Sequence, residues 1–192
     1  MATVKPLFTT ITAGKYKGKK LSLPSLESTR STKSILKGSL FDTLQYDIVD
    51  EVFVEVFGGS GSMGLEALSR GAKHAYFIEK DKDAFSILKS NCKIIDAEHT
   101  TPVLGDSFKV FPELLRSLTS KAYFYFDPPF SIRDGMEDVY DKVLHLISAI
   151  PLDKTHFVVI EHMSELILPD SIGSFHLQKT KKFGKSSLSY YH

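Results

Sequence analysis

The sequence predicts an α/β fold in which helices cover both faces of a mostly parallel sheet. From residue 51 onward, short β-branched and aromatic runs alternate with amphipathic segments, and this order builds parallel sheets through helical crossovers. Four of the apolar runs end in acidic residues or glycines, as expected where an open sheet presents a ligand-binding edge. With 192 residues, the chain is long enough for one such domain and a small extension.

The N-terminal part predicts a hairpin followed by a helix. Residues 7–23 read as two short strands around a glycine-containing turn at 13–18. The polar stretch 25–34 reads as loop. A helix is expected from Thr32, with Ser31 or Thr32 as its cap, because apolar residues recur at helical spacing as far as Leu44.

The rest of the chain predicts the sheet itself. Strands are expected at 51–57, 74–79, 101–106, 121–127 and 156–162, with helices at 62–70, 82–95, 108–118 and 135–149 between them. The tail, residues 175–192, reads as two strands turning at 183–185. A hairpin there would place antiparallel strands at the edge of the sheet.

The formal net charge of +1 hides an uneven distribution. Residues 1–40 carry +7 and residues 171–192 carry +4, whereas residues 41–170 carry −10. This asymmetry indicates a polyanionic partner held by the two ends, although solvated lysine clusters without a partner explain the charge equally well.

Other features of the composition limit the class of protein. No run of 18 apolar residues is present, and the N-terminus lacks the apolar core of a signal peptide. The single cysteine, Cys92, excludes an internal disulfide and a cysteine-rich zinc site. A cytoplasmic location is therefore expected.

A glycine loop follows the first strand of the predicted sheet. In "FVEVFGGSGSMG", residues 53–64, a strand runs into Gly58, Gly59 and Gly61 before a helix begins. Such a loop lets the backbone approach a ligand closely, next to the free N–H groups of the helix. The next strand ends in Glu79, eighteen residues after Gly61, near the interval at which an acid binds ribose hydroxyls. The alternative for Glu79 is an exposed acid at a strand end.

Two further acids end later strands. Asp106 follows the third strand, where it can accept a hydrogen bond from an adenine amino group or cap the helix that begins at Ser107. The stretch "FYFDPPFS", residues 124–131, places Asp127 before two prolines. Prolines cannot continue a strand ladder, so the motif taken alone is also explained as a strand stop with Asp127 capping a turn.

Together these motifs resemble the S-adenosylmethionine-dependent methyltransferases, and the Asp-Pro-Pro-aromatic form resembles enzymes that methylate exocyclic amino groups of bases. The loop "FGGSGSMGLEALSRGA" at 57–72 makes the resemblance more specific. With "ITAGKYKGKKL" (11–21), "TRST" (29–32), "LFDTL" (40–44), "DPPF" (127–130) and "KKFGKSSLSYY" (181–191), it is similar to the RsmD family of bacterial 16S ribosomal RNA guanine-N2 methyltransferases. The resemblance covers nearly the whole chain in order.

The resemblance implies a Rossmann-like class I methyltransferase fold. Its mostly parallel sheet would have seven strands, with helices on both faces and an antiparallel C-terminal hairpin. Residues 1–45 would form a basic hairpin and helix extension, and residues 46–192 the methyltransferase domain. The cofactor would be S-adenosylmethionine, with S-adenosylhomocysteine as product and no metal. The partner would be ribosomal RNA or the assembling small subunit, with no membrane and a monomeric chain.

The resemblance also assigns site residues. Glu79 would hold the ribose and Asp106 the adenine amino group, and the Asp127 carboxylate and Pro128 carbonyl would accept the N–H groups of the target amine. The full cofactor set is Glu55, Phe57, Gly58, Gly59, Ser60, Gly61, Glu79, Lys80, Asp106 and Ser107. The catalytic set is Asp127, Pro128, Pro129 and Phe130, with Phe130 stacking on the base. The RNA-binding set is Lys15, Lys17, Lys19, Lys20, Arg30, Lys181, Lys182 and Lys185.

The chain departs from the family pattern after the hairpin. The family reads Arg-Pro-Thr where this chain has Arg30-Ser31-Thr32. In the helix that follows, the family has an acid, several arginines and the ending Arg-Glu-x-Leu-Phe-Asn, and this chain has other residues there. Those positions hold Ser34, Ile35, Lys37, Gly38 and Asp42. This region is expected to touch RNA or to shape the cofactor entrance.

Three other functions share part of the pattern. An N6-adenine DNA methyltransferase has the same Asp-Pro-Pro-aromatic motif, but 192 residues leave little room for a target-recognition domain. A non-catalytic RNA-binding module would be expected to lack Asp127 or the glycines, which are intact. A dinucleotide oxidoreductase would use the loop and Glu79 but gives residues 127–130 no role.

Overall fold

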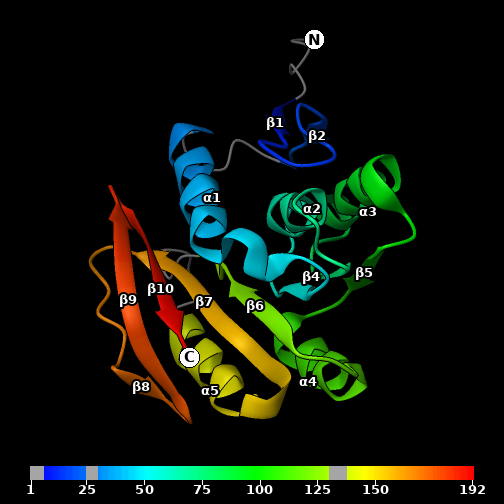
Figure 1. Cartoon of the computed structure of the whole chain (residues 1–192). Helices are drawn as coiled ribbons and strands as arrows, with labels where there is room; N and C mark the ends of the chain where they lie inside the picture. Colours follow the sequence, from blue (N-terminus) through cyan, green and yellow to red (C-terminus); the bar gives the residue numbers. More distant parts are fainter. Residues whose placement is uncertain (1–6, 25–29, 130–137) are drawn as a thin grey trace.

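The computed structural model describes residues 7–24, 30–129 and 138–192, with only the backbone described for residues 30–32. An eight-stranded sheet forms the centre of the molecule, in the order β5-β4-β3-β6-β7-β10-β9-β8 (Figure 1). The bounds of the sheet strands are β3 Val52–Glu55, β4 His74–Glu79, β5 Thr100–Leu104, β6 Ala122–Phe126, β7 Thr155–Met163, β8 Ser171–Ile172, β9 Phe175–Phe183 and β10 Ser186–Tyr191.

The expected fold class is confirmed. Strands β5, β4, β3, β6 and β7 run parallel to one another. Strand β10 pairs antiparallel with both β7 and β9. The strand count differs from the expected seven by β8, whose two residues pair with Phe175 and His176 at the edge of the sheet. So short a strand has no sequence pattern of its own to reveal it.

Five helices cover the two faces of the sheet in the described part of the chain (Figure 1). Their bounds are α1 Arg30–Leu44, α2 Ser62–Ser69, α3 Lys82–Asp96, α4 Ser107–Ser117 and α5 Val139–Ser148, with short 3-10 helices η1 Gln45–Ile48 and η2 Leu152–Lys154. The beginning of the expected helix 135–149 lies outside the described residues. None of the helices described combines the length and the apolar character needed to cross a membrane.

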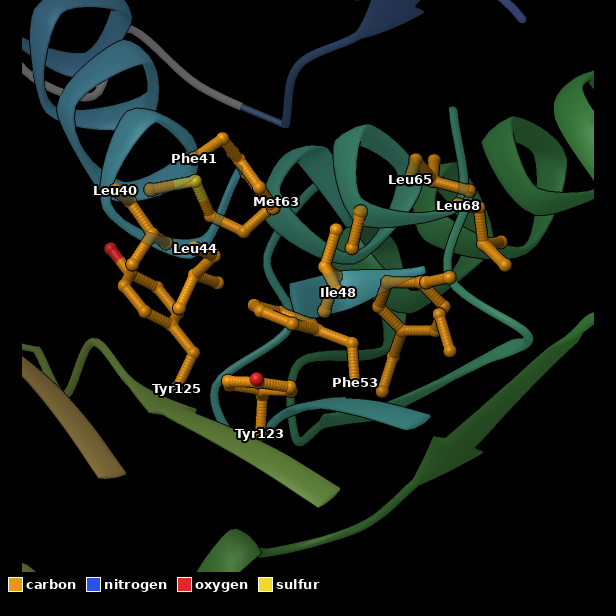
Figure 2. Packing of buried hydrophobic residues seen from close by; sticks show 14 of the residues in the cluster. Leu40, Phe41, Leu44, Ile48, Phe53, Met63, Leu65, Leu68, Tyr123 and Tyr125 are labelled. Atoms are coloured by element: carbon orange, nitrogen blue, oxygen red, sulfur yellow. The ribbon is translucent and has the colours of Figure 1, made fainter. Parts of the chain in front are cut away.

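The side chains of strand β6 pack alternately on the two faces of the sheet. Side chains alternate across a strand, so Tyr123 and Tyr125 join the hydrophobic cluster under α1, α2 and α3, where Phe53 also packs (Figure 2). Phe124 and Phe126 join the opposite cluster under α4 and α5. Burying one phenylalanine side chain contributes about 1.5–3 kcal/mol, so this aromatic strand stabilises both layers.

Helix α1 begins earlier than expected. The stretch 25–34 was expected to be loop, yet residues 30–34 are helical, and Ser31 and Thr32 lie inside the helix instead of capping it. The apolar residues Leu36, Leu40, Phe41 and Leu44 are all buried, and tertiary packing of one face stabilises the polar turn before them.

The N-terminal hairpin is confirmed as strands β1, Phe8–Thr10, and β2, Lys20–Ser22. Its turn rests on the end of α2, where the N–H of Lys15 donates to the Ser69 carbonyl at 2.6 Å and that of Tyr16 to the Ser69 hydroxyl at 2.9 Å. The extension shares the main core, since Ile11 and Leu21 belong to the cluster under α1–α3. The division at residue 45 stays a prediction.

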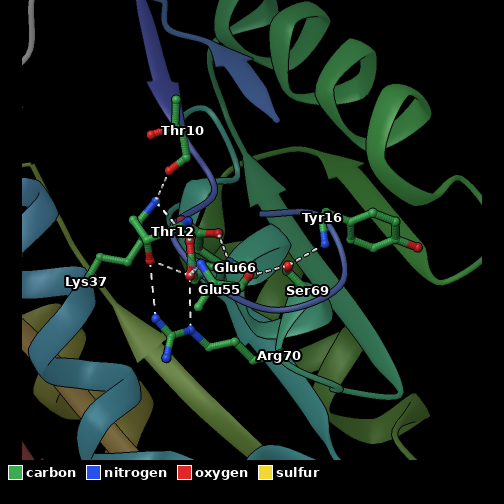
Figure 3. Close-up of polar contacts among 10 residues, drawn as sticks. Thr10, Thr12, Tyr16, Lys37, Glu55, Glu66, Ser69 and Arg70 are labelled. Carbon is green, nitrogen blue, oxygen red and sulfur yellow. Dashed lines mark hydrogen bonds and ion pairs between the residues drawn. The ribbon is translucent and has the colours of Figure 1, made fainter. Parts of the chain in front are cut away.

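Glu66 of α2 joins the hairpin, α1 and α2 through one buried carboxylate (Figure 3). It accepts hydrogen bonds from the Thr12 N–H at 2.9 Å, the Thr12 hydroxyl at 2.6 Å and the Ala13 N–H at 3.1 Å. Lys37 of α1 approaches it at 3.2 Å and Arg70 at 3.0 Å. Burial alone would raise the pKa of Glu66, but Lys37 and the Thr12 hydrogen bonds outweigh burial and lower it.

We predict that Glu66→Gln lowers the free energy of unfolding by about 3–5 kcal/mol at pH 7, because buried Lys37 loses its counter-charge. The pKa of Glu66 is lower in the folded state than its ordinary value of 4.5. The ionised carboxylate therefore stabilises the fold above that pH, and this contribution is lost as the pH falls through the folded value.

Urea denaturation of wild type and Glu66→Gln between pH 7 and pH 3 should show the stability difference shrinking on acidification. The matched control is Glu98→Gln, at an exposed position, which should leave the free energy of unfolding unchanged. A difference that stays constant with pH would contradict the electrostatic origin.

Candidate active site

Four acidic residues lie at the carboxyl end of the parallel strands. Glu55 and Glu79 are the last residues of the adjacent strands β3 and β4. Asp127 follows β6, and Glu161 lies near the end of the neighbouring strand β7, one residue after the Phe126–Ile160 pair. The sheet therefore brings together the acids that the sequence placed at separate strand ends, on the edge where open α/β sheets bind ligands.

The glycine loop after β3 is tied to the end of β4. The Gly58 N–H donates to the Ile78 carbonyl at 2.7 Å, and the Gly59 N–H donates to Glu79 Oε2 at 2.7 Å. Gly59 and Gly61 have φ of 50° and 77°, a left-handed conformation that favours glycine. The loop thus takes a shape that other residues would strain, and Glu79 helps to hold it.

Glu79 keeps capacity for a ligand despite its structural contacts. Its second oxygen, Oε1, accepts from the Asp81 N–H at 2.7 Å. A carboxylate offers about four acceptor sites, so two hydrogen bonds do not saturate it. The expected ribose contact stays a prediction that this geometry permits.

One oxygen of Asp106 caps helix α4, which is the alternative role that the sequence offered for this residue. Oδ1 accepts from the Phe108 N–H at 3.1 Å and caps α4, while Oδ2 lies 3.1 Å from the ammonium of exposed Lys80. The buried hydroxyl of the next residue, Ser107, donates to the Val56 carbonyl at 2.6 Å, and its expected contact with the cofactor stays a prediction.

A cavity of about 100 Å³ lies between the glycine loop and α1. It is lined by Phe57, Gly58, Gly59, Ser60, Ser62 and Met63 of the loop region, by Glu55, Tyr125 and Asp127 of the sheet edge, and by Thr9, Leu23, Lys33 and Lys37 of the N-terminal extension. The cavity joins the expected cofactor loop to the expected catalytic carboxylate. Lys37 belongs to the region expected to touch RNA or to shape the cofactor entrance, whereas Lys33 was not expected at this site.

Glu55 is a buried acid at the wall of this cavity. Its Oε2 accepts from the Gly64 N–H at 2.8 Å, and burial raises its pKa to about 8. At neutral pH the side chain is therefore mostly protonated.

Within the described ranges, no three His, Cys, Asp or Glu side chains gather in a metal-binding arrangement.

Asp127 belongs to a partly buried charge network. The Lys33 ammonium of α1 lies 2.7 Å from Asp127 Oδ2 and 2.7 Å from Glu161 Oε1. The other oxygen of Glu161 accepts a short hydrogen bond from the Tyr125 hydroxyl. Lys33, Glu161 and Tyr125 were missed by sequence reasoning. Glu161 could have been found, because it lies near a strand end as Glu79 does, whereas the partners of Lys33 are 94 and 128 residues away in the sequence.

The charged groups of this network shift one another's pKa values. Burial, followed by repulsion from Asp127, raises the pKa of Glu161 to about 7 even though Lys33 opposes the change. Burial alone would lower the pKa of Lys33, but attraction by Asp127 and Glu161 raises it well above its usual range. Lys33 is therefore a fixed cation between two carboxylates.

The diproline follows Asp127 at the same edge. Pro128 is buried and Pro129 is partly buried, which fits a rigid segment against the core. Phe130, expected to stack on the target base, lies outside the described residues. The roles of Pro128, Pro129 and Phe130 stay predictions.

The lysines expected to contact RNA fall into two groups. Lys15, Lys17, Lys19 and Lys20 are exposed on the N-terminal hairpin. Lys182 and Lys185 are exposed beside the β9–β10 turn, which lies at the carboxyl end of β7 because Ser186 pairs with Met163.

Two members of the expected RNA-binding set stand apart from those groups. Lys181 bonds to the hydroxyls of Ser39 at 3.3 Å and Thr43 at 3.0 Å, so it ties β9 to α1. The side chain of Arg30 lies outside the described residues.

Comparison with known proteins places this site in a family. The family model described as Conserved hypothetical protein 95 matches residues 9–192. The Ribosomal RNA small subunit methyltransferase D of Haemophilus influenzae is 34% identical over 121 residues, which are 62% of this chain and 63% of that protein. The Bacillus subtilis protein YlbH, which carries the provisional name of an rRNA methyltransferase, is 28% identical over 183 residues, or 94% of this chain and 97% of that protein.

A solved structure agrees with these sequence matches. The Escherichia coli protein yhhF superposes with a TM-score of 0.75 at 26% identity, covering 96% of this chain and 97% of that chain. Because the family model spans nearly the whole chain and the fold agrees, the protein belongs to the Conserved hypothetical protein 95 family, the RsmD family of methyltransferases.

Proposed function

We propose that this protein transfers the methyl group of S-adenosylmethionine to the exocyclic N2 of a guanine in small-subunit ribosomal RNA. The observation that carries the proposal is the shared cavity, which the glycine loop and Asp127 line together. A donor held by the loop and an amine held by Asp127 would meet in that space. Relatives in the family carry the name Ribosomal RNA small subunit methyltransferase D, which supports this substrate class.

The residues present fit S-adenosylmethionine. When bound, it supplies a methyl group already activated by a positively charged sulfonium. The cavity would take the reacting end of the donor, at the place where the glycine loop and Asp127 meet. The ribose would be held by Glu79 and the adenine amino group by Asp106, whose side chains lie farther along the same sheet edge. Glu55 would face the charged methionine end.

The acceptor amine needs help from the protein. The lone pair of an exocyclic guanine amine is delocalised into the ring, so the amine is a weak nucleophile. Asp127 and the Pro128 carbonyl would each accept one N–H and orient the lone pair toward the methyl group. Fixed acceptors stabilise the positive charge that develops on nitrogen more than they stabilise the ground state, and positioning supplies much of the remaining rate. Phe130 would stack on a base taken out of its helix or loop.

The two basic groups would bind the RNA on either side of α1. The N-terminal hairpin and the β9–β10 turn lie at separate places in the fold, with α1 between them (Figure 1). Lys182 and Lys185 belong to the sheet edge that also carries Asp127 and Glu161. Phosphate contacts from both groups would present a single nucleotide to the cavity.

We predict that Asp127→Ala lowers methyl transfer by about 100-fold or more while leaving S-adenosylmethionine affinity nearly unchanged, because the acceptor for the amine is removed. The assay follows tritiated methyl incorporation into small-subunit particles and into naked ribosomal RNA, with mass spectrometry of the digested nucleosides. N2-methylguanosine is the expected product.

The matched control for this assay is Asp153→Ala, at an exposed acid of η2, which should retain full activity. Wild-type activity in Asp127→Ala would refute the role of Asp127. A methylated adenosine in the product would refute the choice of guanine N2.

We predict that binding of S-adenosylmethionine at pH 7 releases protons. The pKa of Glu55 is raised to about 8, so the free protein holds this acid mostly neutral, and a nearby sulfonium favours its carboxylate. Affinity should therefore increase as the pH rises toward 8.

Calorimetry in buffers of different ionisation heat measures the proton release directly. S-adenosylhomocysteine, whose sulfur is uncharged, should release fewer protons, and Glu55→Gln should abolish the effect. Identical binding heats in all buffers would show that Glu55 does not respond to the donor.

We predict that the triple charge reversal Lys17→Glu, Lys19→Glu and Lys20→Glu weakens RNA binding and reduces its salt dependence. Each lost phosphate contact lowers the slope of log affinity against log salt by about 0.7–0.9. The control reverses Lys73, Lys93 and Lys121, which are exposed near the amino end of the parallel strands. Equal losses in both triple variants, measured by filter binding between low and high salt, would indicate a general charge effect.

A further inference from the structure

Helix α1 reaches into the candidate active site through Lys33. Its ammonium contacts Asp127 Oδ2 and Glu161 Oε1, each at 2.7 Å. Glu161 has no exposed side-chain surface, and the Tyr125 hydroxyl donates to its other oxygen. One cation from the N-terminal extension therefore serves two carboxylates that belong to the sheet.

We propose that Lys33 is a positioning residue for methyl transfer, which keeps Asp127 ionised and correctly oriented, and that buried Glu161 anchors Lys33 for this purpose. The inference deepens the proposed function and rests on it, because it gives Asp127 the role of amine acceptor. Lys33 lines the cavity, but in this scheme it acts through Asp127 and not on the reacting atoms.

The need for a cation follows from the chemistry of the acceptor. An ionised Asp127 offers both oxygens as acceptors, one for Lys33 and one for the amine N–H, whereas a protonated carboxyl becomes a donor at one of them. Two carboxylates that share a site repel each other, and one of them then tends to hold a proton near neutral pH. Burial and repulsion from Asp127 already raise the pKa of Glu161 to about 7 with Lys33 in place. Without Lys33, the pair would hold its proton to a higher pH.

The contacts also fix the orientation of the carboxylate. Lys33 engages Oδ2 of Asp127, and the proposal assigns Oδ1 to the target amine. The cation cannot drift, because Glu161 is held by the Tyr125 hydroxyl and by its place within β7. Lys33 is thus placed by the sheet as well as by its own helix.

Two further lysines hold helix α1 in place. One turn after Lys33, Lys37 binds Glu66 at 3.2 Å and the Thr10 carbonyl at 2.8 Å. Lys181 of β9 bonds to Ser39 and Thr43. The extension grouped with RNA binding therefore also completes the catalytic edge.

Other titratable groups surround the pair, and one of them, Glu55, has a pKa raised to about 8 by burial and titrates within the range of the test, so its resonance is followed separately from the pair. The surrounding groups are Glu55 of β3, Tyr125 of β6, Tyr140 of α5 and Lys37 of α1. Tyr125 and Tyr140 have pKa values raised by burial, so both remain neutral across the acidic and neutral range.

The test measures the titration of the carboxylate pair in the free protein, where no donor or RNA is needed. Carbon-13 NMR of carboxyl-labelled aspartate and glutamate follows the pair from pH 4 to pH 9, and Asp127→Asn assigns the resonance. Two interacting acids titrate as a unit, so the midpoint of the pair is the quantity compared. Lys33→Met should raise that midpoint by about one pH unit or more.

Three further variants separate charge from structure. Lys33→Arg keeps the cation and should titrate close to wild type. Glu161→Gln keeps an acceptor for Tyr125 but removes the repulsion, so the remaining acid should titrate at a lower pH than the wild-type pair. Lys93→Met removes an exposed positive charge on α3 and should change nothing. Opposite shifts in Lys33→Met and Glu161→Gln are not expected from a purely structural role.

The activity measurement then links the titration to catalysis. The acidic limb of the kcat profile should move to higher pH in Lys33→Met, with activity partly recovered at alkaline pH and KM for the donor unchanged. Lys33→Arg should rescue activity at neutral pH. The inference is overturned if Lys33→Met titrates like wild type, or if its activity loss is the same at every pH. Failure of wild type to methylate RNA would refute the proposed function instead, and the NMR titration would still decide whether Lys33 holds the pair ionised.

Discussion

The carboxyl edge of the parallel strands is the constraint on which the rest of this structure depends. Parallel pairing places Glu55, Glu79, Asp127 and Glu161 along one edge, and like charges so close require compensation. Each acid is accommodated differently. Glu79 accepts backbone N–H groups, Glu55 is buried with a pKa raised to about 8, and Asp127 and Glu161 share Lys33. The edge can therefore combine a neutral acid with charged ones within one small site.

Helix α1 supplies positive charges to the acids around it through two lysines one turn apart. Lys33 and Lys37 are on the same side of the helix, since residues four apart are neighbours on its surface. The first pairs with acids of the sheet and the second with Glu66 of α2. The apolar residues Leu36 and Leu40 are buried on the same helix. Ion pairs and apolar packing thus agree on a single placement of α1, as expected of a sequence that specifies one structure.

Most of the fold could be predicted from the sequence because its signals are local. Alternation in β6, the glycines before α2 and the turn at 183–185 each depend on a few neighbouring residues. Helix α1 was expected from Thr32 and begins at Arg30, so the element itself was predicted closely. The role of Lys33 could not be predicted, because its partners lie 94 and 128 residues away in the sequence. The hydroxyl of Ser107 satisfies a strand carbonyl 51 residues away, a contact that the sequence does not reveal.

The position of β10 has a consequence for how the protein is made. This strand, residues 186–191, follows both of its neighbours in the sequence, yet it lies between β7 and β9 with all six residues buried. Strands β7 and β9 therefore cannot join into one continuous sheet until residues 186–191 have been synthesised and have left the ribosome. Until then β7 exposes an unpaired edge, which in nascent chains invites pairing with other molecules. The eight-stranded sheet therefore becomes continuous only when the last of its strands in sequence order is available to pair.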